Sequence, residues 1–494
     1  MAYESVSTYL GVFDPFQSPA WIEGLAARFG WRREPPAERV YVDFGCGPGE
    51  STLALAALYP SVRFIGIDFN PQHVDSANAQ ARRLRLPNAR YVCADFANLP
   101  QDLPAADLLV VRGTYSWLAP EVKGTLESAL ARLAKPGALL KLHYNVLPGA
   151  VMREGIGRYL AAAGGANLSP ETARNLMNQL RRHAPALAEL FPASGPMLDS
   201  LAAMPDAAWR HDLLNEDYTA EYADRVLGRM QALGFSYVGS LPVERNFPQL
   251  LVDEVLWKQM APRPSAQAQC MLDIATANWV RDDLLVFGTP RARASSFAGD
   301  TRLGLAFPEH KLLEPHRTVR AELKFTGDAM TAIIDQLRVR PRTWRELTET
   351  LDSKLGPQLG VHVDYLLAAG KIGFFLSEAD AGRIDRARVA EINRTRLAQA
   401  VKELNPRTAT PLLAAECGNC LVAGWFESLV LHHFARRGEA NTQQHMLQAM
   451  QRAGMAFPGP DGKRALNQLE RLRQAIARLD ESYVPRMNYW GIAV

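Results

Sequence analysis

One short stretch, residues 40–51, limits the possible folds of this chain more than any other. It reads Val-Tyr-Val-Asp-Phe-Gly-Cys-Gly-Pro-Gly-Glu-Ser, an apolar run that ends in an acid and passes into a glycine-rich turn. An alanine- and leucine-rich segment follows at residues 52–58, so the order predicts a strand, a tight turn and a helix. Gly45 and Gly47 have no Cβ, so the turn can adopt positive φ and its backbone can lie against a ligand.

Two classes of ligand use such a turn, and the glycine spacing separates them. A dinucleotide site has the pattern G-x-G-x-x-G and an open helix N-terminus for the pyrophosphate. Here the third glycine is Gly49, and the next residue, Glu50, would repel a phosphate. It would not repel S-adenosylmethionine, which has no phosphate and carries a cationic sulfonium. The glycines alone could form an ordinary turn, but Asp43 before them and Asp68 after them, where an acid binds ribose hydroxyls, favour a nucleotide-type site.

Three stretches together resemble a known family. Residues 40–51 look like motif I of the class I S-adenosylmethionine-dependent methyltransferases. Residues 107–122 and 143–149 (His-Tyr-Asn-Val-Leu-Pro-Gly) resemble bacterial methyltransferases with a regulatory domain, which include the rickettsial protein-lysine methyltransferases. The resemblance covers roughly residues 1–290. It implies an enzyme of class EC 2.1.1 with S-adenosyl-L-methionine as its cofactor.

Composition narrows the class of protein further. A chain of 494 residues with 48% hydrophobic residues can hold about two to four domains. Its 55 basic and 52 acidic residues give a net charge of +3, so nothing indicates a nucleic-acid partner. Five cysteines in so long a chain do not form a disulfide framework. The first residues lack the features of a signal peptide, and no apolar run reaches the length of a membrane span, so we expect a cytoplasmic protein.

The first 150 residues alternate strands and helices in the manner of a parallel sheet. Strands are expected at 40–44, 62–67, 89–93, 107–111 and 138–144. This rhythm predicts a Rossmann-like α/β sheet with helices on both faces, and ligands bind such sheets at the carboxyl ends of the strands. Five residues at these ends are therefore expected to meet in one crevice: Asp43, Asp68, Asp95, Arg112 and Tyr144.

After Gly149 the strand–helix rhythm stops, and it resumes at Tyr218. Residues 151–212 have a helical pattern, while residues 213–290 supply a last helix and two strands. We therefore expect residues 1–150 and 213–290 to build one seven-stranded methyltransferase sheet, with residues 151–212 as a helical insertion inside it. An inserted helical pair with an apolar face predicts a homodimer through this insertion.

Residues 291–494 lie beyond the predicted sheet. Residues 289–316 are rich in Arg, Ala, Ser and Pro and read as a linker. Three helical patterns and a strand predict a winged-helix-like domain at 291–380, and a helical C-terminal domain is expected at 381–494. A basic cluster beside the helices leaves DNA binding open, but the near-neutral chain favours a substrate-docking module. Cys417-Gly-Asn-Cys420 has the spacing of half a zinc site without the other half, so two thiols packed against helices are expected and no metal site.

The resemblance implies the cofactor-binding residues. They are the glycine turn and the residues at the strand ends: Asp43, Gly45, Cys46, Gly47, Asp68, Phe69, Asp95, Phe96 and Arg112. Asp95 matches the position that accepts from the adenine amino group, and Phe69 and Phe96 could enclose the base, although packing is an equal alternative for Phe69. The resemblance also implies that the opening segment closes over the cofactor, which makes Tyr9, Phe16 and Gln17 candidates; a helix that only covers the sheet edge is the alternative.

The expected chemistry is an in-line displacement at the sulfonium methyl. A lysine amine must first lose a proton, which costs about 4.6 kcal/mol at pH 7 from a pKa of about 10.4, and burial beside a cation lowers that cost. The candidates for this acceptor site are Tyr115, Trp117, Tyr144, Asn145 and His211, with His143 as a further proton acceptor. Core packing is the alternative for Trp117, and a surface position is the alternative for His211. His211 and Asp212 resemble a regulatory-domain signature that faces the crevice.

The sequence is compatible with more than one class of substrate. The family usually has Ser near position 143 and His near position 112, where this chain has His and Arg. The leading hypothesis is a protein-lysine N-methyltransferase, because the large region beyond the sheet favours a protein substrate, such as an outer-membrane or surface protein. The alternatives are a methyltransferase for a small molecule or peptide natural product, and a catalytically silent regulator that binds the cofactor.

Overall fold

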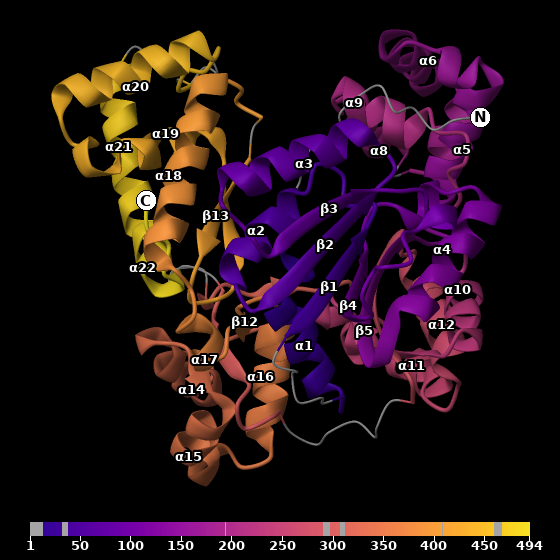
Figure 1. Cartoon of the computed structure of the whole chain (residues 1–494), viewed down its shortest axis with the longest axis horizontal. Coiled ribbons are helices and arrows are strands. Elements are labelled where there is room, and N and C mark those ends of the chain that lie inside the picture. The colour runs from indigo at the N-terminus through magenta and orange to yellow at the C-terminus, as the bar shows by residue number, and fades with distance from the viewer. Residues whose placement is uncertain are drawn as a thin grey trace.

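The computed structural model describes residues 13–31, 38–192, 194–289, 297–306, 312–407, 409–458 and 467–494. Its centre is a seven-stranded sheet with the strand order β3-β2-β1-β4-β5-β7-β6 (Figure 1). The strands are β1 (Arg39–Phe44), β2 (Val62–Asp68), β3 (Ala89–Cys93), β4 (Ala106–Val111), β5 (Ala134–Asn145), β6 (Phe235–Ser240) and β7 (Val280–Phe287). The first five pair in parallel, and β7 runs antiparallel to both β5 and β6. The predicted seven-stranded Rossmann-like sheet is therefore confirmed.

Helices cover both faces of this sheet, so its central strands are buried on both sides. All residues of β1 and β4 are buried, as expected for a parallel sheet between two helical layers. Tyr41 packs into one core with α1, α2 and α3, and the next residue, Val42, packs into the other with α4 and α10. The helices are α1 (Pro19–Arg28), α2 (Glu50–Leu58), α3 (Pro71–Arg83), α4 (Pro120–Leu133) and α10 (Ala223–Ala232).

The segment between β5 and α10 is helical and has a small core of its own. Its α-helices are α5 (Val151–Ala162), α6 (Pro170–His183), α7 (Pro185–Leu190), α8 (Ser194–Ala202) and α9 (Asp206–Ala208). A π-helical turn, Trp209–Leu213, ends the segment. Trp209 is fully buried in the core, together with Leu160 and Met177. The chain returns to the sheet after this segment, as predicted; the domain boundaries and a homodimer through the segment stay predictions.

The described residues between 302 and 375 include three α-helices and a small three-stranded sheet. The helices occur where the sequence indicated them: α14 (Asp328–Val339), α15 (Trp344–Leu355) and α16 (Gln358–Ala368). Strand β8 (Arg302–Leu305) lies between β11 (Arg342–Thr343) and β12 (Ile372–Phe375). The linker prediction was therefore wrong at 302–305, because this four-residue strand forms by pairing with distant residues, which no local pattern reveals. The winged-helix assignment of this region stays a prediction.

The last part of the chain is helical except for one hairpin that the sequence analysis did not expect. Its main helices are α18 (Arg386–Glu403), α19 (Trp425–His432), α20 (Ala440–Arg452), α21 (Gln468–Ser482) and α22 (Val484–Trp490). The hairpin, β13 (Thr410–Ala414) and β14 (Asn419–Ala423), packs against α2 of the core (Figure 1). Cys417 lies in its turn and Cys420 in β14, and burial raises the pKa of the Cys417 thiol to about 12. The two thiols are thus buried in a hairpin that packs against helix α2.

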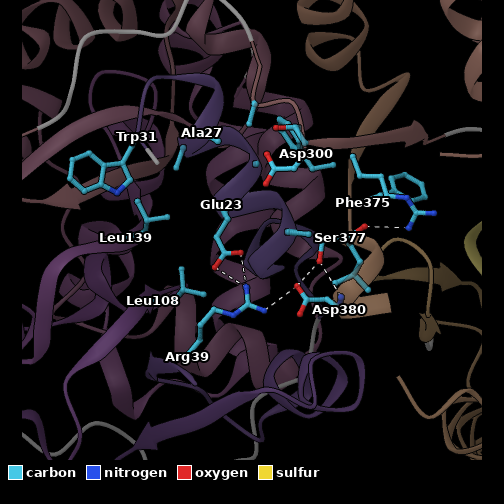
Figure 2. Close-up of a pocket in the computed structure, with 18 of the residues that line it drawn as sticks. Glu23, Ala27, Trp31, Arg39, Leu108, Leu139, Asp300, Phe375, Ser377 and Asp380 are labelled. Atoms are coloured by element: carbon cyan, nitrogen blue, oxygen red, sulfur yellow. Dashed lines mark hydrogen bonds and ion pairs between the residues drawn. The ribbon is translucent and has the colours of Figure 1, made fainter. Parts of the chain in front are cut away.

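A cavity of about 490 Å³ lies where the region beyond the sheet meets the core, at the amino ends of the strands (Figure 2). Arg39, at the start of β1, donates to both carboxylate oxygens of Glu23 at 3.0 and 2.8 Å and to Asp380 at 3.3 Å. Ser377 also donates to Asp380, at 3.0 Å. Charged groups from both regions are therefore paired across this junction. Within the part of the chain that the structure describes, no helix is long and apolar enough to cross a membrane.

Candidate functional site

A larger cavity, of about 630 Å³, opens at the carboxyl ends of the central strands. It is bounded by the glycine turn after β1, the end of β2, the loops after β3 and β4, and the π-helical turn. All nine predicted cofactor residues line it: Asp43, Gly45, Cys46, Gly47, Asp68, Phe69, Asp95, Phe96 and Arg112. The expectation that the strand ends share one crevice therefore holds for these residues, and their individual roles toward a cofactor stay predictions.

The glycine turn has the backbone geometry that its sequence predicts. Gly45, Gly47 and Gly49 have φ values of 76°, 54° and 78°, which favour glycine over any other residue. A Cβ on Gly45 would overlap the side chain of Thr114, whereas a Cβ on Gly47 would meet nothing within 4 Å. The Gly47 amide donates to the Asp68 carboxylate at 2.8 Å. The turn is thus held against the end of β2, with the backbone of Gly47 facing open space.

The cavity is strongly acidic. Six carboxylates line it: Asp43, Glu50, Asp68, Asp95, Asp212 and Asp217. Among the lining residues, all of them within the described ranges, Arg112 is the one Lys or Arg side chain. Such a charge distribution attracts a cationic ligand and repels a phosphate. S-adenosylmethionine carries a sulfonium and an ammonium and no phosphate, so it fits this cavity better than a dinucleotide does.

Asp43 is a buried carboxyl of this cavity, and a group of buried charges acts on it electrostatically. Burial raises the pKa of Asp43 to about 7. One of these charges, Lys141, is fully buried on β5 and pairs with Asp14 at 3.0 Å and with Asp282 of β7. Burial raises the pKa of Asp14, but Lys141 and Arg112 lower it more, so that Asp14 stays ionised. The segment that carries Asp14 is thereby tied to the sheet beside the cavity.

The side chains of Asp68, Asp95 and Gln17 are three polar groups of the cavity wall. The second oxygen of Asp68 accepts from the Asn70 amide at 2.9 Å, and Asp95 accepts from the Ala97 amide at 2.9 Å. These bonds orient both carboxylates at the cavity wall. Gln17 also lines the cavity, and its buried side-chain oxygen has no hydrogen-bond partner within the described residues. Phe16 instead packs against Trp21 at a ring distance of 5.5 Å, and Tyr9 lies outside the described residues.

The predicted acceptor residues separate into two groups. Trp117 and His211 line the cavity, whereas Tyr115, Tyr144 and Asn145 do not. The Tyr115 hydroxyl donates to Glu127 and accepts from Arg229, and the Tyr144 hydroxyl donates to Asp283 at 2.9 Å. The Asn145 side chain donates to the Trp279 carbonyl oxygen at 3.2 Å.

These three side chains therefore bind other parts of the protein and do not line the cavity, and their catalytic role stays an untested prediction. The strand-end rule located β5 correctly but not the direction of its side chains, because successive residues of a strand point to opposite faces. His143, the neighbour of Tyr144, accepts from the Gly113 amide at 3.3 Å. Burial, with Lys141 and Arg112 nearby, lowers the pKa of His143 to about 3, which makes it a weak base.

Asp212 also lines the cavity and is absent from the predicted acceptor residues. It lies in the π-helical turn, a rare geometry that often occurs at functional sites. Burial raises its pKa to about 6, and its nearest cation, Arg153 of α5, is 3.7 Å away. The Trp117 indole donates to the Asp212 carbonyl oxygen at 3.4 Å, and the Arg153 guanidinium lies 5.7 Å from the Trp117 ring centroid. The acid beside His211 in the sequence was the signal that could have identified it.

Comparisons with known proteins agree with this site. Residues 42–137 match the methyltransferase domain family. An uncharacterised protein of Synechocystis sp. is 27% identical over 40% of this chain and 41% of its own length. A trans-aconitate 2-methyltransferase of Methylobacterium radiotolerans is 34% identical over 24% of this chain and 47% of its own. The chain spans about half the length of the curated relatives that it matches.

One solved structure matches nearly the whole chain. PKMT2 from Rickettsia typhi is 17% identical, with a TM-score of 0.70, and the match covers 98% of this chain and 99% of that one. At this identity the match concerns the fold. Together the comparisons confirm a methyltransferase domain, its Rossmann-like fold and S-adenosylmethionine as the implied cofactor.

The affinity for S-adenosylmethionine should depend on pH through Asp43. Because the pKa of Asp43 is raised to about 7, the carboxyl is mostly neutral at pH 6 and mostly ionised at pH 8, and only the ionised form attracts a cation. We expect calorimetry to show about tenfold tighter binding at pH 8 than at pH 6. Asp43→Asn should remove most of this dependence, and Asp217→Asn, at an exposed carboxylate of the same cavity, should retain it. A wild-type affinity that does not change between these pH values would contradict the role of Asp43.

Proposed function

Because the chain carries a methyltransferase domain with an acidic cavity, we propose that it is an S-adenosylmethionine-dependent protein-lysine N-methyltransferase. The observation that carries this proposal is the continuity of the cavity. One space joins the predicted cofactor residues to Trp117, His211 and Asp212, so a cofactor and an amine can meet in it. The shared fold with PKMT2 of Rickettsia typhi, a protein-lysine methyltransferase, supports a protein substrate.

Asp212 supplies what a lysine acceptor needs first. With a pKa of about 6, its carboxylate is largely ionised at neutral pH and attracts a lysine ammonium into the cavity. The carboxylate then accepts a proton from that ammonium, which leaves a lone pair on the amine nitrogen. Arg112 and Arg153 both act electrostatically on Asp212, so they also disfavour a second cation there and favour the neutral amine.

The remaining residues position the two reactants. Asp43, Asp68 and the backbone of Gly47 hold the cofactor on one side of the cavity, and the bound cofactor supplies an electrophilic methyl group. Trp117 offers an aromatic face on the acceptor side, where rings favour an approaching cation. Holding two reactants in line contributes several kcal/mol of the barrier reduction.

A small-molecule acceptor is the second candidate, because the sequence relatives include trans-aconitate 2-methyltransferases. The charge of the cavity opposes an acceptor of that chemistry. Trans-aconitate is a tricarboxylate, and six carboxylates line the cavity here. Repulsion between like charges therefore favours a cationic amine over a polyanionic acid.

The docking of the substrate, the cellular location and the oligomeric state belong to the same proposal. Residues 291–380, the winged-helix-like region, would dock the protein substrate, such as an outer-membrane or surface protein before its export. The enzyme would act in the cytoplasm, as a homodimer through residues 151–212.

Labelling tests the proposed reaction. The purified protein is incubated with S-adenosylmethionine that carries a tritiated methyl group, together with cell-envelope extract of the native host. We expect label in protein bands and its recovery as methyl-lysine after acid hydrolysis. Label confined to the small-molecule fraction would refute the protein substrate, and binding of the cofactor without any transfer would indicate a silent regulator.

Substitution of Asp212 tests the proton acceptor. Loss of a general base lowers turnover by about 10²-fold or more, so Asp212→Asn should lower kcat on the labelled protein by at least that factor. Its affinity for S-adenosylmethionine should stay within about twofold of wild type. In the wild type, kcat/KM should rise with pH through about 6, where Asp212 ionises, and this rise should be absent in Asp212→Asn.

Asp217→Asn is the matched control, because it removes one exposed carboxylate from the same cavity. It should leave kcat within about twofold of wild type. Wild-type turnover in Asp212→Asn, or an equal loss in both variants, would show that Asp212 is not the proton acceptor.

A further inference from the structure

The hairpin of the C-terminal region approaches the core at one glycine. The Gly418 carbonyl oxygen, in the turn between β13 and β14, accepts hydrogen bonds from the Ser18 hydroxyl at 2.9 Å and from the Tyr59 hydroxyl at 2.8 Å. The two hydroxyls are also 2.8 Å from each other. Gly418 has a φ of 63°, and a Cβ there would overlap the Tyr59 hydroxyl. Only glycine permits this close approach without displacement of the hairpin.

Two more contacts reach the segment at 14–18 and the start of α2. The Asn419 side chain donates to the Pro15 carbonyl oxygen at 3.1 Å. Arg396 of α18 pairs with Glu50 at 3.2 Å. Glu50 is the first residue of α2, directly after the glycine turn, and it lines the cavity. The C-terminal region therefore holds both the segment at 14–18 and the start of α2.

The segment at 14–18 lies between the hairpin and the core. On the core side, the Asp14 amide donates to the Ser51 hydroxyl at 3.1 Å, and the Asp14 carboxylate pairs with Lys141 at 3.0 Å. Gln17 of the same segment lines the cavity. No residue of the hairpin lines the cavity, so the hairpin can act on a ligand there only through the residues that it positions.

We propose that Gly418 and Arg396 are positioning residues for the cofactor, and that they couple the C-terminal region to the methyl-donor site. Displacement of the hairpin breaks its contact with Ser18, and displacement of α18 breaks the ion pair with Glu50, so that Gln17 and the glycine turn are no longer held in place. A partner or substrate that moves the hairpin therefore changes the affinity for S-adenosylmethionine. The coupling is reciprocal, so bound cofactor also stabilises the hairpin. This inference rests on the cofactor part of the proposed function and is independent of the acceptor.

A pair of glycine substitutions tests the coupling. Gly418→Ala introduces a Cβ at a positive φ and against Tyr59. Gly454→Ala is the matched control, because Gly454 follows α20 in the same region with a φ of 71° and open space around it. Calorimetry should show that Gly418→Ala raises the Kd for S-adenosylmethionine about tenfold, while Gly454→Ala leaves it within twofold at a similar loss in Tm. A folded Gly418→Ala variant with the same Kd for S-adenosylmethionine as the wild type would refute the coupling.

Two further measurements use a milder substitution, at Arg396, and the wild-type protein. Arg396→Gln should weaken S-adenosylmethionine binding severalfold without lowering Tm, and Arg396→Lys should restore much of it. In the wild type, S-adenosylmethionine should slow hydrogen exchange at the amides of residues 415–420. This measurement does not depend on whether Gly418→Ala folds. Unchanged exchange there on cofactor binding would overturn the proposal. Because none of these measurements involves methyl transfer, a failure of lysine methylation is distinguishable from a failure of the coupling.

Discussion

The hydrogen bond from the Gly47 amide to the Asp68 carboxylate fixes the geometry on which the site depends. It joins the turn after β1 to the end of β2 at 2.8 Å. In the same turn Gly45 lies against Thr114, where a Cβ would overlap the Thr114 side chain. The hydrogen bond sets where the backbone of Gly47 faces the cavity and where α2 begins. Two acids adjoin the turn: Asp43, near the end of β1, and Glu50, at the start of α2. They favour a ligand with positive charge.

Charge is the property that distinguishes this cavity from a dinucleotide site built on a similar sheet. A phosphate-binding turn opens toward a helix N-terminus without an acid, whereas here Glu50 occupies that position and five more carboxylates line the same space. Arg112, the one guanidinium among the described residues of the wall, lies 3.6 Å from Asp14 and forms an ion pair with it. The site therefore suits a cofactor that is itself cationic, and the same field favours an amine acceptor over an acidic one.

Local sequence patterns predicted the parts of the molecule that depend on local physics. The glycine turn and the strand ends were located because each follows from a local strand–turn–helix pattern, whereas the nine cofactor candidates came from the family resemblance, and their roles stay predictions. Side-chain direction at β5 was not predicted: Tyr144 faces the buried Asp283 and not the crevice. Asp212 owes its position to a π-helical turn, and neither that turn nor strand β8 has a local signature. The hairpin at 410–423 was missed for the same reason, since its place depends on packing against α2.

The central claim is that the turn at 45–49 and the acids around it bind a cationic, phosphate-free methyl donor. Calorimetric titration of the purified protein with S-adenosylmethionine, followed by competition with NAD⁺, tests it most directly. The account predicts saturable heat with S-adenosylmethionine and no displacement by NAD⁺. Tight binding of NAD⁺ together with an absence of heat from S-adenosylmethionine would contradict it.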